Sequence, residues 1–197
     1  MAHLNQLVDI KSGFLFKNAV SAYKKGDTAV IQLKDVSPEG EAVFANIEKI
    51  DLPLNNITEP LKVGDILFKA KTNRPVAAMV KEDLGVAVAT AHFFILRIKN
   101  RNIRPGYLAW FLNQKPAQMY FGKHAGGSRI MVVNKQVLGE LEINLPPLAV
   151  QETIVKLHDL QVREDALLDQ LKEKKRALME RQLRRAVEES LKETTHG

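Results

Sequence analysis

The C-terminal part of the chain has the clearest pattern of apolar and polar positions. From Val150 to about Leu191 the sequence contains neither Gly nor Pro and predicts one continuous helix. Its apolar residues recur at spacings of three, four and seven, which places them within a sector of roughly 120° at about 3.6 residues per turn. The residues of this leucine stripe are Val150, Leu157, Leu160, Leu167, Leu168, Leu171 and Leu178.

A helix with this stripe needs a partner. About forty residues at a rise of roughly 1.5 Å extend for roughly 60 Å, which exceeds the width of a small domain. The other faces of the helix are dense in Lys, Arg, Glu, Asp and Gln. We therefore expect another helix to cover the leucine stripe, and we predict that its residues form a dimer interface.

The sequence before the helix predicts mainly strands. Runs rich in β-branched and aromatic residues, bounded by turn residues, carry this prediction. They are Thr28–Val36, Gly64–Lys69, Pro75–Val80, Val86–Lys99, Ile130–Val133 and Leu141–Leu145. Within the longest run, His92 is expected in the core or on a face of the sheet.

A short helix is predicted over 105–114, with Leu108, Phe111 and Leu112 on its buried face. Pro146 and Pro147 would end the last strand and fix φ for the first turn of the long helix. We predict an α+β fold with a curved, mostly antiparallel sheet and short helices, followed by the long helix. The predicted domains are residues 1–146 and 147–197.

The charge is concentrated in the globular part. The chain has 197 residues and a net charge of +6, whereas residues 150–197 contain ten basic and ten acidic side chains. An excess of Lys and Arg favours a polyanion through release of counterions from its phosphates. There is no Cys, no signal-peptide pattern and no long apolar run. We expect a soluble, cytoplasmic protein with no membrane partner.

Two polar segments are candidates for contact with nucleic acid. Gly126 and Gly127 would let the backbone approach a phosphate closely, and a hydroxyl and a guanidinium follow them. The second segment is short, basic and precedes Pro75. The predicted DNA-binding residues are Lys71, Asn73, Arg74, Lys123, His124, Ser128 and Arg129. An ordinary turn and a solvated hairpin tip remain the simpler interpretations of these two segments.

Enzyme classes receive no support from motifs. The five His residues have neither HxxxH nor HExxH spacing, so no metal site is predicted. The sequence also lacks the GxSxG, GxxxxGK[ST] and GxGxxG patterns of a serine hydrolase, a P-loop and a dinucleotide fold. We therefore predict no catalytic residue in this chain.

The order of features resembles the specificity (S) subunit of type I restriction-modification systems. The features are a basic α+β domain, the Gly64–Leu67 sequence, the Tyr107–Asn113 helix, the Gly-rich loop, and Pro146-Pro147-Leu148 followed by Gln151-Glu152 and Ile154-Val155. Such a subunit has two target recognition domains and two long helices that pair antiparallel. With one domain and one helix, this chain is similar to a half-length S subunit.

The resemblance implies a non-catalytic protein that recognises double-stranded DNA. It implies a homodimer in which the long C-terminal helices form an antiparallel coiled coil. This homodimer would read a bipartite inverted site and dock methyltransferase (M) and restriction (R) subunits. No cofactor is expected in this chain, because S-adenosylmethionine, ATP and Mg would belong to those partner subunits. Two alternatives stay open, namely a solitary DNA-binding adaptor or regulator outside restriction and a coiled-coil structural protein without a DNA role.

The distal part of the helix departs from the leucine stripe. Leu183, Val187 and Leu191 lie on another face, and a basic cluster precedes them. This part could pack against a partner's domain or subunit, or it could be a frayed end with i,i+4 ion pairs. The sequence does not separate these two interpretations.

Overall fold

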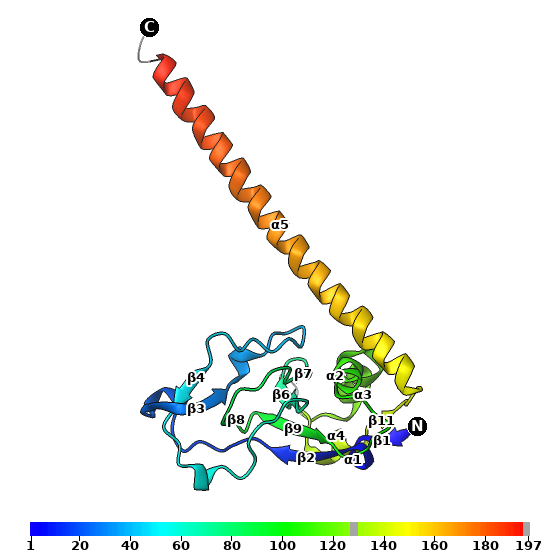
Figure 1. Cartoon of the computed structure of the whole chain (residues 1–197). Helices are drawn as coiled ribbons and strands as arrows, with labels where there is room; N and C mark the ends of the chain where they lie inside the picture. Colours follow the sequence, from blue (N-terminus) through cyan, green and yellow to red (C-terminus); the bar gives the residue numbers. More distant parts are fainter. Residues whose placement is uncertain (127–129, 195–197) are drawn as a thin grey trace. The chain divides into compact units, whose positions relative to one another are not determined.

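The computed structural model describes residues 1–126 and 130–194, and side chains through residue 185 outside the gap. Its contacts divide the chain into two units, Met1–Val155 and Lys156–Gly197. The first unit contains a mixed set of short helices and strands, and the second contains most of one long helix (Figure 1). The predicted boundary between residues 146 and 147 stays a prediction.

A four-stranded antiparallel sheet lies at the centre of the first unit. Its strand order is β2-β9-β5-β7. The strands are β2 (Val8–Ser12), β5 (Ile66–Lys69), β7 (Val76–Met79) and β9 (Phe93–Ile98). In β5 the side chains alternate between two cores, since Ile66 and Phe68 belong to one and Leu67 to the other. This alternation shows that both faces of the central sheet are covered.

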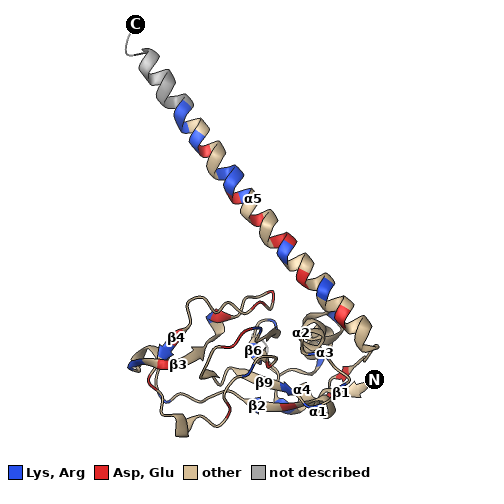
Figure 2. Cartoon of the chain, viewed as in Figure 1, with Lys and Arg blue, Asp and Glu red and all other residues tan. Residues whose placement is uncertain are grey.

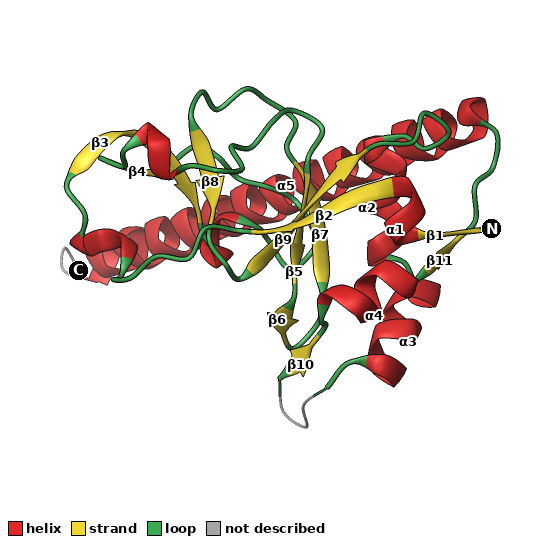
Figure 3. Ribbon diagram, turned by 90° about the horizontal axis from the view of Figure 1, so that it is seen from below, coloured by secondary structure: helices red, strands yellow, loops and turns green. Residues whose placement is uncertain are grey.

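Short helices pack on one face of the central sheet. They are α1 (Leu4–Leu7), α2 (Pro105–Asn113), α3 (Lys115–His124) and α4 (Lys135–Glu140). Their buried residues, including Leu4, Leu108, Phe121 and Leu138, share a core with Phe68. Figure 3 shows α1, α3 and α4 grouped beside the strands of the central sheet. The helix predicted over residues 105–114 is confirmed, with its three predicted apolar residues buried.

The other face is covered by a three-stranded sheet in the order β4-β3-β8. These strands are β3 (Lys25–Ile31), β4 (Glu48–Ile50) and β8 (Ala87–Ala89). The β3–β8 pair is parallel, whereas β3 and β4 are antiparallel. Two small antiparallel pairs complete the unit: β1 (Ala2–His3) with β11 (Glu142–Ile143), and β6 (Lys71–Thr72) with β10 (Met131–Val132). The α+β fold class is confirmed.

Two strand predictions were wrong in detail. The run Val86–Lys99 forms β8 and β9, separated by a turn at Ala91 and His92, so His92 is exposed and not in the core. The chain changes sheets at this turn, which hydrophobicity alone does not reveal. The run Thr28–Val36 ends as a strand at Ile31 and continues as the 3-10 helix η2 (Leu33–Asp35). Two more 3-10 turns, η1 (Val20–Ala22) and η3 (Leu54–Asn56), connect elements of this side.

The long helix α5 (Leu148–Thr194) begins directly after the two prolines, as predicted. The carbonyl oxygen of Pro147 accepts hydrogen bonds from the amides of Val150 and Gln151, at 2.9 and 3.1 Å. Figure 2 shows basic and acidic residues interspersed along its described part. The seven residues of the leucine stripe are each between 45% and 63% exposed. In this single chain the stripe therefore has no cover.

Candidate nucleic-acid interface

The two polar segments singled out in the sequence lie side by side in the structure. β6 pairs with β10 in antiparallel register, with Lys71 opposite Val132 and Thr72 opposite Met131. Val132 also exchanges backbone hydrogen bonds with Gly126, at 2.8 and 3.1 Å. The segment after β5 and the glycine-containing loop thus form one continuous edge, which we call the β6–β10 edge. Ser128 and Arg129 of this loop lie outside the described residues.

The predicted residues of the first segment are available for contact. Lys71, Asn73 and Arg74 are all exposed. Arg74 donates one long hydrogen bond, 3.4 Å from Nη2 to the carbonyl of Asn113. Lys69 differs from them, because its ammonium donates to the Val36 carbonyl and burial lowers the pKa of the amine. The free positive charge on this side of β5 therefore belongs to Lys71 and Arg74.

Lys123 and His124 occupy the last turn of α3 and not a loop, which corrects their predicted setting. Both are exposed. The His124 ring stacks on Tyr120 with centroids 4.3 Å apart, and Nδ1 lies 2.9 Å from the Tyr120 carbonyl. His124 also lines a groove that contains Glu140 and Glu142. Carboxylates repel phosphate, so Lys123 is the better candidate for contact with DNA.

Two part-buried amides attach the segment that follows the β6–β10 edge to the helices. Asn113 at the end of α2 exchanges two hydrogen bonds with the backbone of Ala77 in β7, at 2.9 and 2.8 Å. Gln118 in α3 donates to the carbonyls of Pro75 and Leu112, at 3.0 and 2.8 Å. The sequence did not indicate the role of either residue, because an Asn or Gln in a helix gives no local indication that its side chain binds a distant backbone group.

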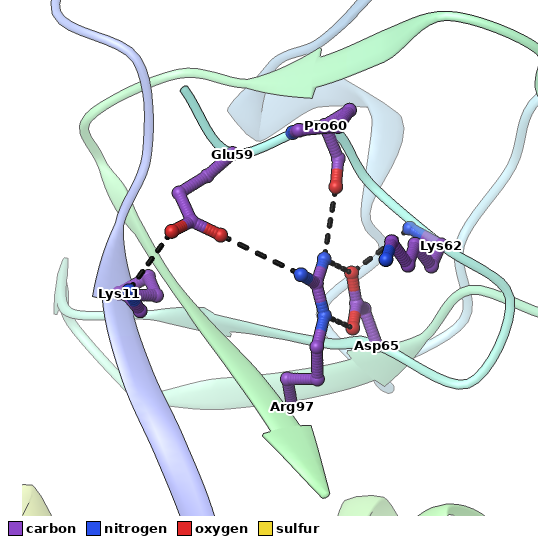
Figure 4. Close-up of polar contacts among 6 residues, drawn as sticks. All are labelled: Lys11, Glu59, Pro60, Lys62, Asp65 and Arg97. Atoms are coloured by element: carbon purple, nitrogen blue, oxygen red, sulfur yellow. Dashed lines mark hydrogen bonds and ion pairs between the residues drawn. The ribbon is translucent and has the colours of Figure 1, made fainter. Parts of the chain in front are cut away.

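The Gly64-Asp65 sequence has a structural role. Asp65 is only 2% exposed and accepts two hydrogen bonds from Arg97, from Nε at 2.8 Å and Nη2 at 2.7 Å (Figure 4). The amide of Lys62 donates to the same carboxylate at 2.9 Å. The Asp65 hydrogen bonds raise the pKa of Arg97. Gly64 has a φ of 89°, a conformation that favours glycine at this turn.

Glu59 extends this network to the strand β2. Its carboxylate lies 2.9 Å from the ammonium of Lys11 and 3.5 Å from Nη1 of Arg97 (Figure 4). The hydrogen bond from Lys11 lowers the pKa of Glu59 and raises the pKa of Lys11. The loop that carries Glu59 and Pro60 is thus attached to two strands of the central sheet. This network stabilises the scaffold, and none of its residues belongs to the β6–β10 edge.

The start of α5 is fastened to the domain by a fully buried side chain. Gln151 is 0% exposed, and its Oε1 accepts from the Arg104 amide at 2.9 Å. Its Nε2 donates to the carbonyls of Asn102 and Pro146, at 2.9 and 2.8 Å. Val155 packs against the same core one turn later. The motif that follows the prolines therefore joins domain to helix through specific hydrogen bonds.

Among the residues that the structure describes, no three His, Asp or Glu side chains gather in a way that could hold a metal ion. The described helices include none with the apolar length needed to cross a membrane. The exposed polar groups of the β6–β10 edge can donate hydrogen bonds to phosphates and base edges. This chemistry makes the β6–β10 edge a candidate binding surface.

The chain belongs to the family of the type I restriction modification DNA specificity domain, whose model matches residues 1–175. No curated protein matches the sequence.

Solved structures share the fold. One is the S subunit of a type I restriction-modification system from M. genitalium, with 14% identity, a TM-score of 0.55 and coverage of 81% of this chain and 37% of that chain. Another is the HsdS subunit from Thermoanaerobacter tengcongensis, with 22% identity, a TM-score of 0.58 and coverage of 83% and 42%. A third is a chain from a structure that concerns complex assembly and conformational transition of the type I R-M system, with 17% identity, a TM-score of 0.58 and coverage of 82% and 42%. The chain spans about two fifths of their length.

Proposed function

We propose that this chain is a DNA sequence-recognition subunit of a type I restriction-modification system and performs no catalysis itself. Family membership supports a role in DNA specificity. The observation that carries the proposal to particular residues is the pairing of β6 with β10, since it gathers the exposed Lys71, Asn73 and Arg74 beside the Gly126 loop. A helix-borne Lys123 leads into the same loop.

The roles of these residues differ in this proposal. Lys71, Arg74 and Lys123 supply charge for phosphates, and Asn73 has the donor and acceptor pair that can read an adenine edge. Ser128 and Arg129 remain proposed contacts on the basis of the sequence. His124 is the weakest member, because its ring is stacked on Tyr120 and two carboxylates line its groove.

We further propose that a second copy covers the leucine stripe. Two recognition domains would then read an inverted pair of half-sites, as a two-fold axis requires. Methyltransferase and restriction subunits would dock on this dimer and bring S-adenosylmethionine, ATP and Mg. A DNA-binding adaptor outside restriction is the second candidate, and it shares the same interface.

Binding of the full chain to a random duplex library, followed by sequencing, tests the DNA role. We expect enrichment of two inverted half-sites with a fixed spacer, and an affinity that falls steeply with salt. Lys71→Ala or Arg74→Ala should lower affinity for all sequences and reduce the log–log salt slope by about one unit each. Asn73→Ala should instead relax selection at one position of the half-site.

Lys49→Ala serves as the control, because Lys49 is also exposed but lies on β4, which belongs to a different sheet from β6 and β10. It should leave the selected sequence unchanged. A salt slope near zero for the wild-type chain would contradict a role in DNA recognition. Equal losses in Lys49→Ala and Arg74→Ala would show that only overall charge matters, which would overturn the assignment to this edge.

A further inference from the structure

We propose a register for the antiparallel pairing of two copies of α5: the two-fold axis lies at the level of Asp169, and Glu164 of each copy lies against Lys174 of the other. This inference rests on the proposed homodimer and gives it a defined register. The occupant of the leucine stripe is thus the same helix, running in the opposite direction.

A heptad frame places the leucines at two core positions. Leu157, Leu171 and Leu178 fall at the first position, which we call a, and Leu160 and Leu167 fall three residues after an a position, at d. Three charged residues interrupt the same frame, namely Glu164 at a and Lys174 and Arg181 at d. All of these side chains are exposed in the single chain. Their charges must be accommodated when the stripe is covered.

A parallel dimer does not accommodate them. In a parallel pair each core residue meets its own copy, so Glu164 would face Glu164 and Lys174 would face Lys174. Like charges held together in a desolvated core are strongly unfavourable. In an antiparallel pair the a positions of one helix meet the d positions of the other. Glu164 can then meet a basic residue.

One antiparallel register satisfies both the leucines and the charges. With the axis at Asp169, Leu171 meets Leu167, Leu178 meets Leu160, and Glu164 meets Lys174. The two-fold axis produces every layer twice. The outermost layer places Leu157 against Arg181, whose aliphatic stem can cover the leucine while the guanidinium reaches water. Leu168 of each copy flanks the axis, which explains why the stripe widens there.

Neighbouring registers are worse. A slide by one heptad in one direction leaves Leu171 with Leu160 as the only leucine layer and places Glu164 against Leu167. A slide in the other direction leaves only Leu178 with Leu167 and places Lys174 against Leu171, although Glu164 then meets Arg181. Each slide loses one of the two leucine layers, and the first slide also loses every pair of opposite charges. The register centred on Asp169 is therefore selected by its two leucine layers, and its charge pairing excludes the first slide.

The proposed layers are compatible with the packing of the helix start on its own domain. Gln151 and Val155 face the domain core. They lie about 100° to 140° around the helix from Val150, whereas the leucine stripe extends to the opposite side of Val150. The layers begin at Leu157 and end at Arg181, an overlap of roughly 36 Å. The domain contact and the proposed pairing thus use separate faces of the helix.

Disulfide trapping in the full chain tests the register. Because the chain has no Cys, single substitutions give unique thiols. Leu160→Cys and Leu178→Cys should each remain mostly uncrosslinked alone but give a covalent dimer when mixed. The pair Leu167→Cys and Leu171→Cys should behave in the same way. A parallel dimer would crosslink in each single variant, and crosslinking of Leu160→Cys with Leu171→Cys would support a shifted register, so either result overturns the proposal.

Charge reversal provides an independent readout. Glu164→Lys and Lys174→Glu should each weaken the homodimer by about tenfold or more, and the double variant should restore it. A mixture of the two single variants should form heterodimers. Lys172→Glu is the matched control, since Lys172 lies outside the frame and pairs with Asp169 at 3.0 Å. A mass of 22.1 kDa at all concentrations would overturn the register, whereas DNA binding by such a monomer would leave the recognition role intact.

Discussion

Asp65 shows how one buried carboxylate organises the middle of the recognition domain. It holds Arg97 through two short hydrogen bonds and receives a backbone amide as well. Removing its charge would leave the guanidinium, only 28% exposed, without its main partner. We expect Asp65→Asn to lower the free energy of unfolding by about 3 kcal/mol. Urea denaturation of the full chain measures this loss.

Asp9→Asn is the control for that measurement. Asp9 also forms an ion pair, at 3.6 Å with Lys99 just after β9, but this pair lies on the surface. Exposed ion pairs contribute little, so this change should stay within about 0.5 kcal/mol. Similar losses of unfolding free energy in the two variants would show that the Arg97–Asp65 pair stabilises the fold no more than an exposed ion pair does. DNA affinity per folded molecule should be unchanged in both.

Candidate site residues could be proposed from the sequence where suitable residue types stand beside a turn signal. Lys71, Asn73 and Arg74 were proposed on this basis, and the structure leaves them exposed, whereas their contact with DNA stays a prediction. His92 was misplaced, since the aromatic run around it conceals a turn between two sheets. The pairing of residues 71–72 with 131–132 joins segments far apart in the sequence, and local pattern contains no information about it.

At the scale of elements, Gln151 links α5 to the domain. Its amide makes three hydrogen bonds, and none of its surface is exposed. We expect Gln151→Ala to lower the free energy of unfolding by about 2 to 3 kcal/mol, because two carbonyls and one amide lose a buried partner. In this variant, backbone amides in the first two turns of α5 should exchange faster than in the wild type, whereas exchange in β5 and β9 should change less.

The adjacent residue supplies a matched control. Glu152 forms an ion pair with Arg104 at 2.8 Å, but its side chain is 49% exposed. Glu152→Gln should therefore change stability by less than about 0.5 kcal/mol and leave exchange in α5 unaltered. If Gln151→Ala also left stability and hydrogen exchange unchanged, the first turns of α5 would be held by the apolar packing of Ile154 and Val155 alone.

Long elements were predictable and short ones were not. The helix α2 follows from its apolar face and the proline at its first position, and the helix α5 follows from its periodicity and the two prolines directly before it. The helices α3 and α4 were missed, because Lys115–His124 is mostly polar and Lys135–Glu140 has only six residues. Their stability comes from packing of Phe121 and Leu138 in the core, which is a tertiary effect.

At the scale of the whole molecule, the proposed pairing through the leucine stripe would set the spacing of two domains on DNA. If α5 pairs about Asp169, the separation depends on the number of residues between Pro147 and that axis. Residues beyond Arg181 lie outside the proposed layers and contribute nothing to this distance. The spacer in the DNA site is thus expected to depend on one half of the helix only.

Duplicating the heptad Lys156–Val162 tests this dependence. The insertion keeps the a and d frame and moves each domain away from the axis by seven residues, or roughly 21 Å in total for the dimer. At roughly 3.4 Å per base pair, the preferred spacer should lengthen by about six base pairs while the half-site sequence stays the same. Duplicating the heptad that follows Arg181 should leave the spacer unchanged. Sequencing of the selected duplexes measures both, and an equal shift in the two variants would mean that the distal half of α5 also sets the distance between the domains.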